Sequence, residues 1–175
     1  MADLNFKEQL KNIKAFVFDV DGVFSSSKMY LNPDGEMLRS TNIKDGYSIF
    51  HARRMNFPIA IISGGSSEAT RKRFEYLGVE HIYLSSKNKL IDFEDFLSKA
   101  NLKAEDILYM GDDLPDYPVM KLVGIPTCPA DAAVEIKSIA KYISDRKGGE
   151  ACVRDVVEQV LRAQGKWMNA ESFTW

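Results

Sequence analysis

Short apolar runs alternate with longer amphipathic segments along this 175-residue chain, and that alternation predicts the fold. The apolar runs, which are typical of buried strands, are residues 15–18, 57–62, 81–84, 107–110, 125–128 and 142–143. Helices are expected between them, at residues 45–55, 68–77, 90–100, 117–122, 132–139 and 151–164. This order implies an α/β fold with a doubly wound, mostly parallel sheet. The length favours a single domain over residues 1–175.

One segment interrupts the alternation between the first strand and the first long helix. Residues 32–35 read Asn-Pro-Asp-Gly, a strong turn signal between two short apolar stretches, so we predict a β-hairpin over residues 28–41. Its position places it as a flap over the carboxyl edge of the sheet. An isolated hairpin is marginally stable in water, so it should pack on its own domain or on another subunit.

The last segment, residues 165–175, carries three aromatic side chains: Trp167, Phe173 and Trp175. Exposed tails rarely keep so many aromatic residues, so we expect this tail to dock. We predict that it packs against a neighbouring subunit near its site and affects product release.

Composition and charge exclude several classes of function. The net charge of -2 gives no reason to expect nucleic acid or a membrane as partner. The two cysteines, Cys128 and Cys152, follow no metal-binding pattern and are expected to be free thiols in a reducing compartment. Residues 1–14 lack the apolar core of a signal peptide, and no apolar run approaches the ~20 residues of a membrane span. We therefore expect a soluble, cytoplasmic protein.

Three of the predicted strands end in unusual polar residues. These are Asp19 and Asp21 after the first strand, Ser63 and Gly64 after the second, and Asp112, Asp113 and Asp116 after the fourth. Each group alone is also typical of a solvated turn or a helix cap. Right-handed crossovers, however, bring all three strand ends to one edge of the sheet, where open α/β folds bind ligands. This convergence favours a functional site.

Clustered carboxylates without histidine or cysteine favour a hard cation, and Mg²⁺ is the first candidate. Ser63, the Gly64 N–H and Lys89 would bind the oxygens of a phosphate. Lys89 lies in a first helical turn, where its charge opposes the helix dipole; a nearby anion would explain it, and a solvated lysine is the alternative. His51 and His81 are expected to be structural or exposed.

Such a site can hydrolyse a phosphate ester through an aspartyl-phosphate. Two unit charges ~4 Å apart repel by about 4 kcal/mol at an effective dielectric of ~20, and Mg²⁺ and Lys89 would offset this repulsion. The second aspartate can protonate the leaving oxygen and later deprotonate water. This division fits Asp19 as nucleophile and Asp21 as acid/base.

These residues together resemble the haloacid dehalogenase superfamily of phosphatases. The matching motifs are Asp19-x-Asp21-Gly22, Ser63, Lys89 and Gly111-Asp112-Asp113-x-x-Asp116. A narrower resemblance is to the phosphatases of 3-deoxy-D-manno-octulosonate 8-phosphate, through residues 42–47, Pro118-Val119-Met120, Gly148-Gly149 with Arg154, and Ala163-Gln164-Gly165. The resemblance implies a Rossmann-like fold without a large cap domain, and a homotetramer in which hairpin 28–41 covers a neighbouring site. It also implies a role in lipopolysaccharide precursor synthesis.

The resemblance also assigns roles to the motif residues. It implies that Mg²⁺ is held by the Asp19 carboxylate, the Asp21 backbone carbonyl and Asp112. Asp113 and Asp116 would support the site, partly by orienting Lys89.

The sugar-acid substrate that the resemblance implies carries a carboxylate, which arginine recognises well. We expect Arg73 to make that contact, with Arg71 as the second candidate. Gly65, with Ser63 and Gly64, would line the substrate site; relatives that act on nine-carbon sugar acids can carry an acidic residue there, so Gly65 favours the eight-carbon substrate. One departure is Glu150, where many relatives have an arginine.

Other functions remain open at this stage. Receiver domains also combine clustered aspartates with a lysine and accept phosphate on an aspartate, although they need no acid/base partner two residues on. A non-catalytic module on a phosphatase fold is a second alternative. Within the enzyme class, a nine-carbon sialic-acid-type phosphate or a polyol phosphate could be the substrate.

Overall fold

The structure is a computed structural model that describes residues 6–35 and 37–175. Residues 1–5, at the start of the segment tested for a signal peptide, and Glu36, in the second predicted hairpin strand, lie outside the described residues.

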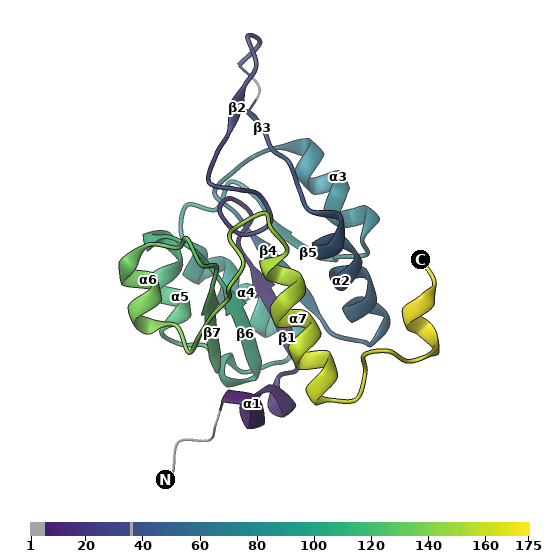
Figure 1. The fold of residues 1–175 in the computed structure, drawn as a ribbon. Coiled ribbons are helices and arrows are strands. Elements are labelled where there is room, and N and C mark those ends of the chain that lie inside the picture. The colour runs from purple at the N-terminus through teal and green to yellow at the C-terminus, as the bar shows by residue number, and fades with distance from the viewer. Residues whose placement is uncertain (1–5, 36) are drawn as a thin grey trace.

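A parallel sheet forms the centre of the molecule (Figure 1). Its strands, in the described residues, are β1 Ala15–Phe18, β4 Ile59–Ile62, β5 His81–Tyr83, β6 Ile107–Met110, β7 Ile125–Cys128 and β8 Tyr142–Ile143. They lie in the order β5-β4-β1-β6-β7-β8. The central strand β1 pairs with β4 and β6, with Phe18 opposite Ile61 on one side and Met110 on the other. The predicted α/β fold with a doubly wound sheet is confirmed.

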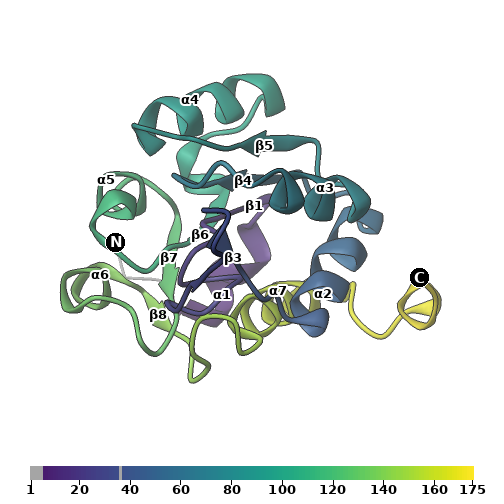
Figure 2. The same cartoon turned by 90° about the horizontal axis from the view of Figure 1, so that it is seen from above.

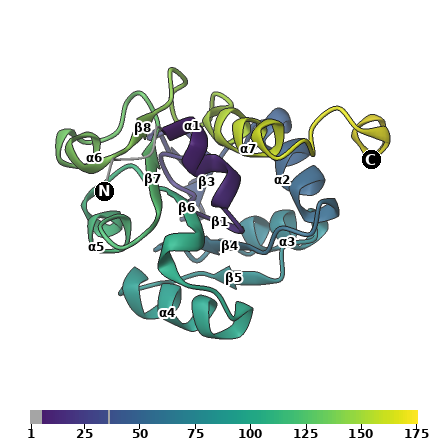
Figure 3. The same cartoon turned by 90° about the horizontal axis from the view of Figure 1, so that it is seen from below.

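Helices cover both faces of this sheet (Figures 2 and 3). They are α1 Phe6–Gln9, α2 Ile43–Arg54, α3 Glu68–Tyr76, α4 Lys89–Ala100, α5 Tyr117–Met120, α6 Val134–Ile139 and α7 Cys152–Ala163. Side chains of α2, α3 and α7 pack on the face that carries Phe16 and Phe18, and those of α4, α5 and α6 pack on the face that carries Ala15 and Val17. Since successive residues of a strand point to opposite faces, the continuous apolar run of β1 serves two cores.

Several element bounds differ from the sequence prediction for local reasons. Helix α2 begins two residues earlier than expected because the Asn42 side chain caps it, accepting from the Lys44 N–H at 2.9 Å. Helix α6 begins at Val134, and α5 ends at Met120. The short α1, which the sequence prediction missed, continues as a 3₁₀ turn over Leu10–Asn12.

The predicted hairpin is present and stands away from the sheet (Figure 1). Strands β2 Tyr30–Leu31 and β3 Met37–Leu38 pair antiparallel, and the Gly35 N–H closes the turn on the Asn32 carbonyl at 2.8 Å. The large apolar side chains on it, Met29, Tyr30, Leu31, Met37 and Leu38, are all exposed. Within the described residues, nothing larger than this hairpin forms a cap, as expected.

The tail docks, but on its own chain. Trp167 and Trp175 pack edge-on against the ring of Tyr47 in α2, and the tail ends in a 3₁₀ turn over Ala170–Phe173. Arg54 donates to the Glu171 and Thr174 carbonyls at 3.0 and 3.2 Å. Phe173 and Trp175 remain largely exposed, at 71% and 61%. That the tail also packs on a neighbouring subunit and affects product release stays a prediction.

Both cysteines are buried free thiols. In the described part of the chain, we find no helix that combines the length and the apolar character needed to cross a membrane.

Candidate active site

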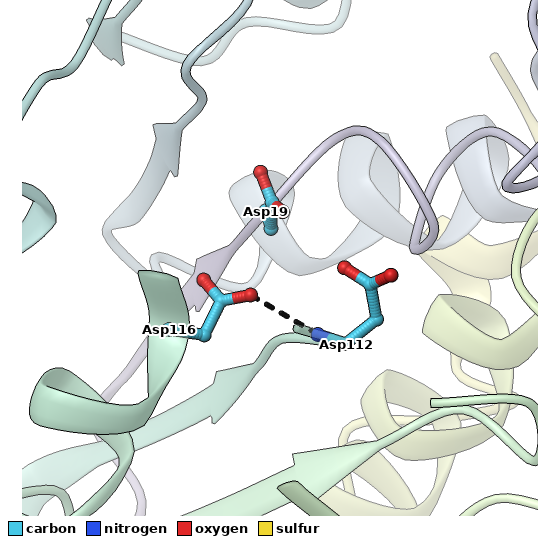
Figure 4. A group of neighbouring side chains, drawn as sticks. All are labelled: Asp19, Asp112 and Asp116. Carbon is cyan, nitrogen blue, oxygen red and sulfur yellow. Dashed lines mark hydrogen bonds between the residues drawn. The ribbon is translucent and has the colours of Figure 1, made fainter. Parts of the chain in front are cut away.

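Three carboxylates meet at the carboxyl edge of the sheet (Figure 4). Asp19 follows β1, and Asp112 and Asp116 follow β6, the strand beside it. One oxygen from each lies within 4.8 Å of the other two. The Asp19 N–H donates to the Met110 carbonyl at 3.0 Å, so the sheet pairing continues to the residue that carries the first carboxylate. The sequence prediction that these strand ends converge is correct.

Lys89 joins two of these carboxylates. It is the first residue of α4, and its Nζ lies 2.9 Å from Asp19 Oδ2 and 2.7 Å from Asp116 Oδ1. Burial lowers the pKa of Lys89, but attraction by Asp19 and Asp116 outweighs burial and holds that pKa above its ordinary value. The nearby anions that we expected from the position of Lys89 are therefore these carboxylates.

Asp116 is a scaffold for its neighbours. Besides Lys89, its Oδ1 accepts from the Tyr109 hydroxyl at 2.5 Å, and its Oδ2 accepts from the Asp112 and Asp113 N–H groups at 3.1 and 3.4 Å. The Asp113 side chain turns to the Leu114 N–H at 2.8 Å and caps the next 3₁₀ turn. Both aspartates thus fix the loop that carries the Asp112 carboxylate.

The electrostatics of the cluster favour a bound cation. Burial, together with repulsion from Asp116, raises the pKa of Asp19 to about 7. Burial, with repulsion from Asp19 and Asp116, raises the pKa of Asp112 to about 8. A divalent cation between Asp19 and Asp112 would offset both the repulsion and the lost hydration, and the donors there are all oxygens. The residues present therefore fit the Mg²⁺ that the sequence predicted.

These carboxylates line a cavity of about 490 Å³. Ser63, Gly64 and Gly65 form another part of its wall, and residues 26–29 at the base of the hairpin form a third. The Ser63 hydroxyl is buried and accepts from the Gly65 N–H at 3.1 Å. The three strand ends of the sequence prediction therefore share one cavity, with Lys89.

The loop that follows β1 needs glycine directly after Asp21. Gly22 has a φ of +82°, and a Cβ on it would lie 1.9 Å from Asp112 Oδ2. A side chain at this position would therefore displace the Asp112 carboxylate as well as strain the backbone.

Known proteins are similar to this chain in sequence. A family model described as haloacid dehalogenase-like hydrolase matches residues 66–153. A Salmonella typhi protein named 3-deoxy-D-manno-octulosonate 8-phosphate phosphatase KdsC is 40% identical over 156 residues, which span 89% of this chain and 83% of that protein. The chain belongs to the haloacid dehalogenase-like hydrolases.

Solved structures of such hydrolases have the same fold. The 3-deoxy-D-manno-octulosonate 8-phosphate phosphatase of Yersinia pestis matches with a TM-score of 0.90 and 34% identity, over 93% of this chain and 88% of that one. The Moraxella catarrhalis phosphatase of the same name, solved in complex with a magnesium ion, a phosphate ion and a KDO molecule, matches with a TM-score of 0.89 and 28% identity, over 94% and 95% of the two chains. Because relatives that match most of this chain are phosphatases, this hydrolase is a phosphatase.

The two arginines that we expected at the substrate carboxylate do not line the cavity of this hydrolase. Arg73 turns to α2, where its Nη2 lies 2.3 Å from the position that a Cβ on Gly46 would take. Arg71 lies on α3 with its Nε 3.9 Å from Glu68 Oε2. Glu150, the departure from many relatives, is exposed and is likewise absent from the cavity wall.

Instead, an arginine that the sequence prediction missed reaches the site of this hydrolase. Arg39 follows β3, and its guanidinium pairs with the Asp21 carboxylate through both Nε and Nη2. The Nη2–Oδ2 distance is 2.9 Å, and the Arg39 side chain is partly buried, with 10% of its surface exposed. A basic residue within the predicted hairpin was the available signal, but its contact with Asp21 depends on the path that the chain takes from β3 to α2.

Proposed function

We propose that this phosphatase hydrolyses 3-deoxy-D-manno-octulosonate 8-phosphate to the free sugar acid and phosphate. The observation that carries the proposal is the pair Asp19–Lys89 beside Asp112 at one cavity, in a chain that is 40% identical to a protein named for this reaction. A catalytic arrangement of this kind supports phosphoryl transfer in general, and the named relatives supply the substrate class.

In this proposal Asp19 is the nucleophile. Its Oδ1 is oriented by the Val20 N–H at 2.7 Å and its Oδ2 by Lys89 at 2.9 Å. An Asp19 oxygen attacks phosphorus, the bond from phosphorus to the sugar oxygen breaks, and an aspartyl-phosphate forms. Lys89 stabilises the charge that develops on the transferring group, aided by the buried position of the site.

Asp21 serves as acid and then base. It protonates the departing sugar oxygen and later removes a proton from the water that hydrolyses the aspartyl-phosphate. Asp19 is restored when the bond between its oxygen and phosphorus breaks.

Mg²⁺ would be held by the Asp19 carboxylate, the Asp21 backbone carbonyl and Asp112. When bound, it supplies positive charge that lowers the repulsion between the phosphate and the carboxylates. Ser63 and the N–H of Gly64 would hold phosphate oxygens at the part of the cavity wall that residues 63–65 form.

The hairpin supports a proposal about assembly. Its large apolar side chains are between 40% and 79% exposed, and its base forms part of the cavity wall. We propose that four copies assemble, with hairpin 28–41 of each covering a neighbouring site.

The first experiment is phosphate release with Mg²⁺ from a panel of eight-carbon and nine-carbon keto-acid phosphates and polyol phosphates, by the wild type and by Asp19→Asn. We expect the highest kcat/KM with the eight-carbon substrate, and a background rate with Asp19→Asn. Equal release over the panel would discard the substrate and keep the phosphatase. Phosphate that stays on the protein would indicate a receiver-like function.

A further inference from the structure

The ion pair between Arg39 and Asp21 has a consequence for how the site selects its substrate. All three guanidinium nitrogens of Arg39 are engaged: Nε and Nη2 with Asp21, and Nη1 with the Met37 carbonyl at 3.0 Å. The Arg39 side chain is 10% exposed, whereas that of Asp21 is 38% exposed on the cavity wall. The arginine therefore approaches the catalytic aspartate from the hairpin side, and the substrate approaches it from the cavity.

This ion pair interferes with the acid and base roles proposed for Asp21. Its Oδ1 accepts from Arg39 Nε and from the Ser25 hydroxyl at 3.3 Å, and its Oδ2 accepts from Arg39 Nη2. Both oxygens are thus occupied by donors. To act as the acid, Asp21 must carry a proton, and a protonated carboxyl has lost the negative charge that holds the guanidinium in place. The ion pair with Arg39 must therefore loosen before Asp21 protonates the departing sugar oxygen.

A carboxylate on the substrate is the group best suited to take Arg39 away. A guanidinium binds a carboxylate with two parallel hydrogen bonds, the arrangement that Arg39 already makes with Asp21. The leaving oxygen must come within hydrogen-bonding reach of Asp21. Arg39 does not itself line the cavity, but its Nη2 lies 2.9 Å from Oδ2 of Asp21, which does, so the guanidinium lies directly behind the wall that the sugar meets. Gly65 leaves room there, because a Cβ on it would lie 3.1 Å from Arg39 Nη2.

We propose that Arg39 is the specificity-determining residue of this phosphatase: it pairs with Asp21 in the free enzyme and moves to the carboxylate of the sugar-acid substrate, which frees Asp21 to act. The exchange replaces one guanidinium–carboxylate pair by another, so a substrate that carries a carboxylate releases the aspartate without leaving a buried charge unpaired. A phosphate ester without a carboxylate must break the pair with no replacement and reacts slowly. The inference rests on the proposed function, since it requires a sugar-acid substrate.

The test compares wild type, Arg39→Gln and Arg39→Lys on three phosphate esters. These are 3-deoxy-D-manno-octulosonate 8-phosphate, mannose 6-phosphate, which has no carboxylate, and p-nitrophenyl phosphate, whose leaving group departs without a proton. Arg162→Gln is the matched control, because Arg162 lies at the far end of α7, 57% exposed and paired with Glu158. Thermal unfolding of each variant checks that it is folded.

For Arg39→Gln we expect kcat/KM to fall 10- to 100-fold with the sugar acid and to rise with mannose 6-phosphate. The rate with p-nitrophenyl phosphate, whose hydrolysis still needs Asp21 as the base, is the reference: the sugar-acid rate should fall further than this rate does. Arg39→Lys keeps the charge but loses the bidentate geometry. Its preference for the sugar acid should therefore lie between that of the wild type and that of Arg39→Gln. An equal fall on all three esters would show a structural role and overturn the proposal, as would an unchanged preference.

The activity of the wild type tests the proposed substrate separately from the role of Arg39. If it hydrolyses p-nitrophenyl phosphate but not the sugar-acid phosphate, the proposed substrate is wrong. If it prefers the sugar acid and Arg39→Gln keeps that preference, the substrate stands and the role of Arg39 falls.

Discussion

At the scale of single residues, Lys89 supports both the stability and the chemistry of the site. It is the cation placed between the buried carboxylates of Asp19 and Asp116. Lys89→Met would leave both buried carboxylates without a positive charge beside them. We therefore expect the metal-free protein to lose about 3 kcal/mol of unfolding free energy at pH 8. Turnover should fall to background. Urea unfolding in EDTA and phosphate release measure the two effects.

A second variant tests whether the loss comes from the unpaired charges. In Lys89→Met combined with Asp116→Asn, an amide can still accept from the Asp112 N–H and donate to the Tyr109 hydroxyl, while one buried charge is gone. The double variant should therefore be more stable than Lys89→Met alone. Losses that simply add would contradict the pairing argument.

The same scale shows what the sequence could predict of the site. Asp19, Ser63 and Asp112 follow directly from their position at strand ends, because parallel strands bring those ends together. Arg39 could not be found in this way. It lies outside the strands of the central sheet, and its contact with Asp21 is set by the path of the chain between β3 and α2.

At the scale of elements, helix α7 is capped by a residue from α2. Asp45 is fully buried, and its Oδ1 accepts from the Arg154 N–H at 2.6 Å, in the first turn of α7. Residue 151, at the N-cap position, is an alanine with a φ of +72° and offers no side-chain cap of its own. The sequence predicted α7 from its valine stripe, but a cap supplied from 109 residues away has no local signal.

This cap predicts a pH dependence of stability. Burial raises the pKa of Asp45 to about 6, whereas an unfolded aspartate titrates near 3.8. Between these values the folded chain binds more protons than the unfolded chain, so stability decreases as the pH rises. Asp45→Asn keeps an oxygen that accepts from the Arg154 N–H but carries no charge. Between pH 4 and pH 7 the unfolding free energy of the wild type should therefore fall relative to that of the variant by up to about 3 kcal/mol. Urea unfolding at a series of pH values would show a constant difference if the argument is wrong.

The tail is the second element with a testable role. Trp167 lies under the guanidinium of Arg154 at 4.4 Å and edge-on to His51. Deleting residues 167–175 uncovers this side of α2, and the lost aromatic contacts, about 2 kcal/mol together, should lower the melting temperature by about 4–8 °C. Differential scanning calorimetry measures this change in melting temperature. An unchanged melting temperature would mean that the packing on α2 adds little.

At the scale of the whole molecule, the hairpin is the feature that an assembly must cover. Leu31 is 79% exposed at its tip. If four copies associate through the hairpins, Leu31→Asp should shift sedimentation velocity from a tetramer towards smaller species and lower kcat/KM. Ile91→Asp, on the exposed side of α4, is the control and should leave both unchanged. A wild type that sediments as a monomer would end the assembly proposal.

The position of β1 in the sheet also determines how long this strand waits for its neighbours during synthesis. This strand is the first of the sheet to leave the ribosome, yet it lies between β4 and β6, the second of which ends at Met110. At a synthesis rate of ~10 residues per second, the apolar stretch Ala15–Phe18 waits on the order of ten seconds for its last partner. Throughout that interval at least one edge of the strand has no neighbour, so we expect chaperones that bind nascent apolar segments to bind it.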